Sequence, residues 1–174
     1  MRRSAADIAL RVQVGLPEGL ITQVADGMLD VAVMYAPQNR PGLKVDQLLE
    51  ETLVLVTTDP SVTPLSSPDY VYVDWGPEFA IHHGMSSPDV TNPGLFVGLG
   101  PLALSYIVEA GGSGYFRRRA VTPYLDSGKL HLVPGAPSFS YPIYAVRAVN
   151  ADEALVEQAL DSLRAVAALD AHAA

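Results

Sequence analysis

The pattern of apolar and polar residues predicts an alternation of strands and helices from the start of the chain. Apolar residues occupy every second position over residues 8–14, a period typical of a strand with one covered face. Pro17 then suits the first turn of a helix that ends near Gly27. The expected apolar face of this helix consists of Leu20, Ile21, Val24 and Met28.

A continuous apolar run over residues 31–34 follows this helix. The run is too short for a helix and is typical of a strand covered on both faces, as in a parallel sheet. A second, β-branched run covers residues 51–58, and the Ser/Pro-rich stretch over 59–68 ends it. We therefore expect the chain to cross into a second lobe after residue 58.

Two strand–helix units are predicted in the second lobe. Residues 70–73 are expected to form a strand that leads into a helix over about 77–83. Residues 95–97 are expected to form another strand, followed by a helix over 101–110 that the glycine pair at 111–112 terminates. Strands that alternate with helices in this way predict an α/β fold with mostly parallel sheets.

The remaining residues are expected to return to the first lobe. A weak helix over 117–125 and a strand over 129–133 precede a returning strand over 141–149. The last helix opens at Asn150 with Glu153 three positions later, as in a capping box. Its buried stripe is expected at Leu155, Ala159, Leu163 and Val166.

In order and spacing, the chain resembles the effector-binding domain of LysR-type transcriptional regulators over residues 7–147. The resemblance rests on an acidic turn before a buried strand, a Pro-Gly loop, a glycine turn and the closing strands. The matching positions are Gly27, Leu29, Asp30, 31–33, 41–43, Leu48, Glu50, Glu51, 53–56, 108–116, 123–125, 127–130, Val133, Pro142, Tyr144 and Val146.

This resemblance implies an α/β fold of the type 2 periplasmic-binding-protein kind, with two Rossmann-like lobes joined by two crossover segments. Lobe I would comprise residues 1–58 plus 141–174, and lobe II residues 59–140. Family members carry an N-terminal winged helix-turn-helix domain, and we expect no DNA-binding domain in this chain. DNA would then be reached only through that absent domain. The strand and helix that precede residues 8–14 in the family are also expected to be absent.

The predicted ligand contacts lie at the carboxyl ends of strands, where small ligands bind in open α/β sheets, and the resemblance implies a cleft between the lobes. Aromatic residues among them favour a planar or apolar effector, and free N–H groups at the helix start near Gly100 suit an anionic one. The candidate residues are Met34, Tyr35, Ala36, Asp74, Trp75, Gly76, Phe79, Gly98, Gly100, Gly112, Ser113, Gly114, Tyr115 and Phe116. A connecting loop at 35–37, core packing of Trp75 and a helix C-cap at 111–112 are the structural alternatives.

Patterns that would indicate an enzyme are incomplete in this sequence. The glycines at 98 and 100 have the spacing of a dinucleotide fingerprint, but residues 117–119 are arginines where that motif needs an acid. Ser113 lacks the second glycine of a nucleophile elbow, because position 115 is Tyr. His82 and His83 are adjacent and would not face one metal from a helix. We therefore expect no catalytic residues, no cofactor and no metal.

Composition limits the partners. The chain has 174 residues and a net charge of -8, which opposes unaided binding to a phosphate backbone. It has no Cys, no apolar leader after Arg2 and Arg3, and no run near the roughly 20 apolar residues of a membrane span. We expect a cytoplasmic location with no membrane partner.

The leading hypothesis is a ligand-sensing domain that binds a small metabolite between two lobes and works as a homo-oligomer, as a dimer in the full regulator. A solute-binding protein is one alternative, although it should carry a signal peptide or a lipoprotein Cys. A truncated remnant that acts only through protein–protein contacts is the other.

Overall fold

The computed structural model describes residues 9–61, 65, 68–88, 90 and 93–171, with side chains up to 166. The chain divides into two compact units: unit 1 is Met1–Glu50 with Pro142–Ala174, and unit 2 is Glu51–Tyr141. One long strand, β2 (Leu43–Thr57), belongs to both units. The lobe boundaries that we expected after residues 58 and 140 remain a prediction.

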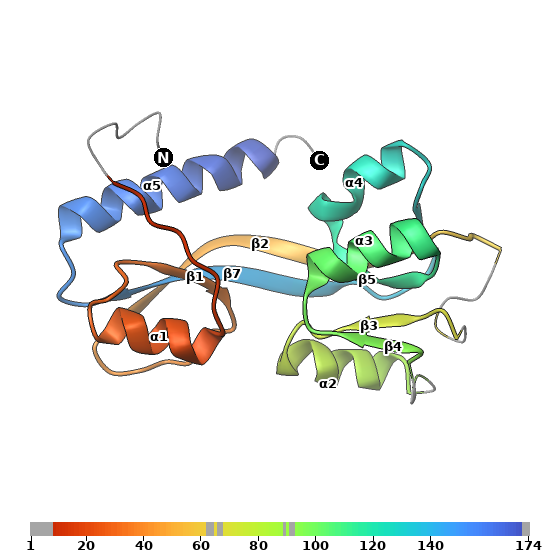
Figure 1. Cartoon of the computed structure of the whole chain (residues 1–174), viewed down its shortest axis with the longest axis horizontal. Helices are drawn as coiled ribbons and strands as arrows, with labels where there is room; N and C mark the ends of the chain where they lie inside the picture. Colours follow the sequence, from red (N-terminus) through yellow and green to blue (C-terminus); the bar gives the residue numbers. More distant parts are fainter. Residues whose placement is uncertain (1–8, 62–64, 66–67, 89, 91–92, 172–174) are drawn as a thin grey trace. The chain divides into compact units, whose positions relative to one another are not determined.

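Unit 1 contains helices α1 (Pro17–Ala25) and α5 (Glu153–Ala171) and most of strand β7 (Phe139–Ala148) (Figure 1). Strand β1 (Ala32–Tyr35) pairs with β7, and β7 pairs with β2, so that the strand order is β1-β7-β2. The apolar face of α1 packs helix α1 onto the sheet, because Ile21 and Val24 are buried in one cluster with residues of β1 and β7. The predicted helix after Pro17 is thereby confirmed.

The prediction that residues 31–34 form a strand covered on both faces, as in a parallel sheet, is wrong. Strand β1 pairs with β7 in the antiparallel direction, with Ala32 opposite Val146. Ala32 and Met34 are buried, whereas Val33 between them is 46% exposed. The face of β1 that carries Ala32 and Met34 is buried beneath α1, whereas Val33 on the other face stays partly exposed.

The strand predicted over residues 8–14 is also absent. Residue 8 lies outside the described residues, and residues 9–14 have no regular secondary structure. Their alternating apolar side chains are exposed, with Val12 at 78% and Val14 at 97%. A strand needs a hydrogen-bonded neighbour, and no described strand pairs with this segment.

The ends and stripes of the unit 1 helices differ from prediction by small shifts. Met28 is 72% exposed, because α1 ends at Ala25 and the chain turns at Gly27 (φ 70°). In α5, the N–H of Leu155 donates to Asp152 Oδ1, so Asp152 rather than Asn150 caps the helix. The fully buried residues of α5 are Val156 and Leu160, each one residue after a predicted position, and Leu163 packs against them as predicted. The predicted residues Leu155 and Ala159 are half-buried, and Val166 is exposed.

Unit 2 confirms both predicted strand–helix units. Strand β3 (Val71–Val73) leads into α2 (Pro77–Ser86), and β4 (Leu95–Val97) leads into α3 (Gly100–Ala110). The two strands pair in parallel, with Val71 beside Leu95. Both strands therefore end at the same edge of their sheet, where α2 and α3 begin.

The pairs that β2 forms with β5 and β6 in unit 2 are antiparallel, which the expectation of mostly parallel sheets did not include. Strand β5 (Ser113–Arg117), where only a glycine turn was expected, pairs antiparallel with β2. Helix α4 (Arg118–Asp126) contains Pro123 and confirms the weak helix, and β6 (His131–Leu132) also pairs antiparallel with β2. Helix α3 and strands β2, β3 and β5 enclose the larger core of this unit. No helix among the described residues has both the length and the apolar character that crossing a bilayer requires.

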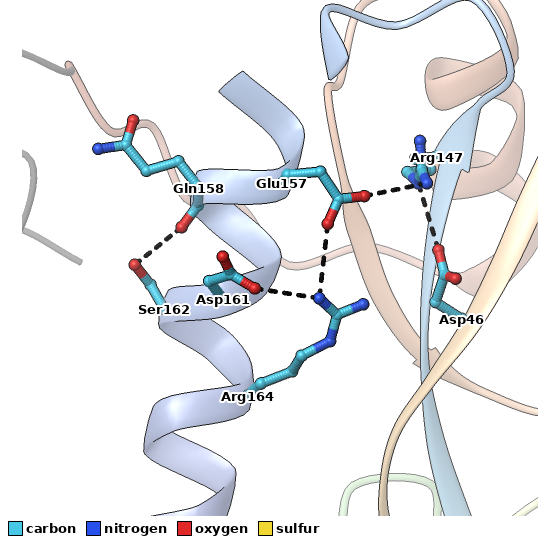
Figure 2. A network of polar contacts seen from close by, with 7 residues as sticks. All are labelled: Asp46, Arg147, Glu157, Gln158, Asp161, Ser162 and Arg164. Carbon is cyan, nitrogen blue, oxygen red and sulfur yellow. Dashed lines mark hydrogen bonds and ion pairs between the residues drawn. The ribbon is translucent and has the colours of Figure 1, made fainter. Parts of the chain in front are cut away.

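An ion-pair network joins three elements of unit 1 (Figure 2). The Arg147 side chain on β7 is only 8% exposed; its Nε donates to Asp46 Oδ2 on β2 and its Nη2 to Glu157 Oε1 on α5, both at 3.2 Å. Arg164 Nη1 extends the network to Glu157 and Asp161 at the surface of α5. One buried guanidinium thus ties two neighbouring strands to the last helix.

Replacing this guanidinium should destabilise unit 1. Arg147→Ala removes a buried side chain and leaves the partly exposed carboxylates of Asp46 and Glu157 without their shared cation. We therefore expect a loss of about 1–3 kcal/mol in the free energy of unfolding, measured by urea denaturation. Arg164→Ala, at the exposed end of the same network, should cost under about 0.5 kcal/mol. Equal losses for the two variants would show that the buried part of the network contributes no more than its surface.

Candidate functional site

The candidate site in unit 2 begins with a tight turn at the carboxyl end of β3. The side chain of Asp74 accepts the N–H of Gly76 at 2.9 Å, and Gly76 has a φ of 97°, which favours glycine. Pro77 then opens α2, where a missing N–H costs nothing. The N–H of Asp74 donates to the Val97 carbonyl at the end of β4. Two predicted strand ends are therefore joined at this edge.

Trp75 is held by this turn and packs on the start of α3. Its Nε1 donates to the Tyr115 carbonyl at 2.9 Å, and its ring meets the ring of Tyr141 edge-on at 5.3 Å between centroids. A Cβ built on Gly100 would overlap the Trp75 ring. Gly100 thus makes room for the indole. The structure brings Trp75, Gly76 and Gly100 together, and Tyr141 is a neighbour that the sequence did not suggest.

The start of α3 offers fewer free N–H groups than predicted. Leu102 and Ala103 both donate their N–H to the Leu99 carbonyl at 3.1 Å, and Pro101 has no N–H. The first turn therefore leaves fewer N–H groups for an anion than expected, and the binding of an anionic effector here stays a prediction. Gly98, before this turn, is exposed.

The glycine turn is filled by the protein's own backbone. Gly112 donates its N–H to Thr58 Oγ1 at 2.9 Å and has a φ of 130°, and a Cβ there would lie 2.6 Å from the Asp69 carbonyl oxygen. A Cβ on Gly114 would lie 2.9 Å from the Val71 carbonyl oxygen. Ser113, between them, is buried. These glycines let the chain before β3 approach closely, which is a structural reason for their presence.

Three predicted aromatic contacts are buried in the unit 2 core. Phe79, Tyr115 and Phe116 have almost no exposed surface. Phe79 and Tyr115 pack edge-on at 5.6 Å between ring centroids, and the Tyr115 hydroxyl donates to the Pro137 carbonyl. Their contact with a ligand stays a prediction, and the packing gives each of them a role in the core.

The candidate residues of unit 1 lie at the end of β1. Met34 is buried beneath α1, Tyr35 is half-buried and Ala36 is exposed. Ala36 has a φ of 41°, which side-chain-bearing residues rarely adopt. Local strain of this kind collects at binding loops, where the surrounding structure maintains it.

A buried tyrosine–histidine pair in unit 2 escaped the sequence analysis. The Tyr70 hydroxyl and His83 Nε2 lie 2.8 Å apart, and both residues are buried. Rings of Tyr72, Phe79 and Tyr115 also lie within ring-contact distance of His83. Two sequence patterns could have indicated this pair: Tyr70 and Tyr72 alternate at the start of β3, and Phe79 and His83 are four residues apart on α2.

Burial sets the protonation of this pair. Burial lowers the pKa of His83, so its imidazole is neutral near pH 7. Burial also raises the pKa of Tyr70, and it raises the pKa of the neighbouring Tyr115 to about 12. His82, the residue before His83, is exposed. The described residues contain no group of three or more His, Cys, Asp or Glu side chains placed to hold a metal ion.

Comparison with known proteins finds one matching family model. Residues 1–66 match the family model described as the LysR substrate binding domain. The match covers 66 of the 174 residues, and over them the chain is similar to LysR substrate-binding domains. The resemblance inferred from the sequence is thereby confirmed, and the α/β fold of this domain is the type 2 periplasmic-binding-protein fold. No curated protein matches the chain.

Solved structures of LysR family regulators share this fold at low identity. The regulatory domain of MetR from N. meningitidis is 14% identical with a TM-score of 0.72, over 97% of this chain and 84% of that one. Full-length LysG from Corynebacterium glutamicum is 17% identical with a TM-score of 0.68, over 97% of this chain and 61% of that one. Full-length HypT from Salmonella typhimurium is 13% identical with a TM-score of 0.68, over 87% of this chain. This chain spans 56% of the length of that regulator.

Acid should destabilise unit 2 through His83. Its pKa is lowered in the folded state, so the unfolded chain takes up this proton first as pH falls. Stability is then full above the unfolded pKa of about 6.5 and declines as pH falls below it. We expect His83→Gln to flatten the slope of unfolding free energy between about pH 6.5 and 5, measured by urea denaturation at each pH, and His82→Gln to leave it unchanged. An unchanged slope in His83→Gln would contradict the assignment.

Adding a side chain to the glycine turn should be costly. Gly112→Ala places a methyl group against the Asp69 carbonyl at a strained φ, and we expect a loss of about 2 kcal/mol or more. Gly19→Ala in α1 is the matched control, because nothing lies within 4 Å of its Cβ, and it should stabilise by about 0.5–1 kcal/mol. Thermal and urea unfolding followed by circular dichroism measure both. A tolerated Gly112→Ala would mean that the chain before β3 moves freely away from the turn.

Proposed function

We propose that the chain is the ligand-sensing domain of a LysR-type transcriptional regulator and binds a small metabolite. The match of residues 1–66 to the LysR substrate binding domain carries this proposal. LysR substrate-binding domains are regulatory and not catalytic. A solute-binding protein shares the fold, but the matching family model favours the regulator. On this proposal the domain acts in the cytoplasm as part of a homo-oligomer, and it meets DNA only through another domain.

In this proposal, the effector is held by loops at strand ends of both lobes, in the predicted cleft. The predicted contacts include Tyr35, the strained Ala36, Trp75 and Gly76. Two observations support these choices: Ala36 is exposed with a φ of 41°, and Trp75 is fixed in place by its bond to the Tyr115 carbonyl. A pre-positioned indole lowers the entropic cost of binding.

The surroundings of Trp75 favour one class of effector. The indole and the Tyr141 ring form an aromatic corner. The exposed Asp74 carboxylate precedes Trp75 in the sequence and accepts the N–H of Gly76. The first turn of α3 offers little to an anion. We therefore propose an effector with an apolar or planar part and a positively charged or donor group, such as the amino group of an aromatic amine or of an amino acid, facing Asp74. Full-length LysG has been solved with bound effector Arg, which agrees with this class.

Ligand binding can be followed directly, because Trp75 is the only Trp of the chain. We expect a screen of amino acids and small aromatic amines to find a compound that changes the Trp75 fluorescence and saturates. Isothermal titration calorimetry should then show at least a tenfold weaker Kd for Trp75→Ala and for Tyr35→Ala, a cost of about 1.4 kcal/mol or more.

Val33→Ala is the matched control for the second variant, since Val33 lies on the same strand with its side chain on the exposed face. It should leave the Kd unchanged. A saturating ligand whose Kd is insensitive to both Trp75→Ala and Tyr35→Ala would refute this map of the site, and a screen of the class without any saturating compound would count against the effector chemistry.

A further inference from the structure

One buried histidine of unit 2 touches the aromatic residues on which the candidate site rests. His83 of α2 is 3% exposed, and its Nε2 lies 2.8 Å from the Tyr70 hydroxyl. Its ring meets the Tyr115 ring edge-on at 5.6 Å between centroids. A polar ring among aromatic side chains costs free energy unless its nitrogens are bonded, so the contact with Tyr70 stabilises this arrangement.

Tyr115 links His83 to the indole of Trp75. The Tyr115 carbonyl accepts the Nε1–H of Trp75 at 2.9 Å, and the Tyr115 hydroxyl donates to the Pro137 carbonyl. Trp75 also packs against a buried cluster whose aromatic members all have ring contacts with His83. These members are Tyr70, Phe79, Tyr115 and Phe139. The indole and the imidazole therefore rest on the same side chains.

A proton on His83 would meet no opposite charge among the described groups that face it. Burial alone lowers the pKa of His83. The charged or titratable neighbours on its own helix, Glu78 and His82, are exposed. The elements packed against His83 present three phenols and one phenyl ring. These are Tyr70 and Tyr72 of the β3 segment, Tyr115 of β5 and Phe139 of β7.

Protonation changes which hydrogen bond His83 can form. In the neutral ring, Nε2 can accept the hydrogen of the Tyr70 hydroxyl, whereas an imidazolium carries N–H groups on both nitrogens and only donates. The Tyr70 hydroxyl would then accept from Nε2 and lose the acceptor of its own hydrogen. Burial raises the pKa of Tyr70, so the phenol keeps its proton and supplies no negative charge. A buried charge and an unsatisfied hydroxyl both favour looser packing of the cluster.

We propose that His83 is a positioning residue whose neutral ring holds Trp75 in place, and that its protonation frees the indole and so weakens effector binding in acid. The route runs from His83 through the shared aromatic rings to the Tyr115 carbonyl, which fixes the indole. The effect on an effector rests on the proposed function. The release of the indole does not, and it can be tested without a ligand.

Acrylamide quenching of fluorescence in the full chain tests this release, because Trp75 is the only Trp. We expect the quenching constant to rise about twofold or more between about pH 7.5 and 5.5, in a one-proton transition centred below the ordinary histidine pKa of about 6.5. The far-UV circular dichroism should stay unchanged over this range. His83→Gln should keep the constant at its neutral-pH value, since the amide oxygen accepts the Tyr70 hydrogen but does not titrate. His82→Gln, at the exposed neighbour, is the matched control and should retain the transition.

Proton NMR of the wild-type chain gives a second measurement that does not depend on the folding of a variant. The chain has four histidines, and we expect one imidazole to titrate below the others, at the midpoint of the quenching transition. Quenching that is independent of pH, a transition that His83→Gln retains or that coincides with loss of the far-UV signal, or a midpoint that no histidine shares would each overturn the proposal. Failure to find an effector would instead count against the proposed function and leave these results as they are.

Discussion

The close approach of the backbone to residues without side chains sets the geometry of unit 2. A Cβ at Gly112 or Gly114 would strike the carbonyl oxygens of Asp69 or Val71, and a Cβ at Gly100 would strike the Trp75 ring. β5 and the chain entering β3 can therefore lie side by side, and α3 can begin against the indole. Everything at the shared edge of β3 and β4 follows from this packing, including the position of Trp75.

Local patterns were enough to predict α1, β3, α2, β4 and α3. Each of these elements is specified by its own periodicity and by Pro or Gly residues at its ends, which act over a few residues. Strand β5 was missed because Ser113–Arg117 has no alternation and depends on pairing with β2, far away in the sequence. The direction of β1 was wrong for a related reason: a short apolar run looks the same in parallel and antiparallel sheets.

The candidate site was predicted in part. Its location at strand ends is a property of the α/β fold, so Asp74, Trp75 and Gly100 could be chosen from sequence, and the structure brings the last two together. The burial of Phe79, Tyr115 and Phe116 could not be chosen in this way, because the side of a helix or strand that faces the core depends on neighbours from elsewhere in the chain. The pairing of Tyr70 with His83 was missed for the same reason.

The crowding around Gly112 and Gly114 also bears on how the sequence of this domain can drift. Nothing lies within 4 Å of a Cβ built on Gly84 in α2, and its φ is not left-handed, so a new side chain there meets only open space. Gly128 and Gly135, in the turns on either side of β6, have the same open space but φ values of 70° and 74°, which a side chain rarely adopts. Evolutionary variation among these glycines of unit 2 is therefore channelled toward α2 and away from the residues that join α3 to β5.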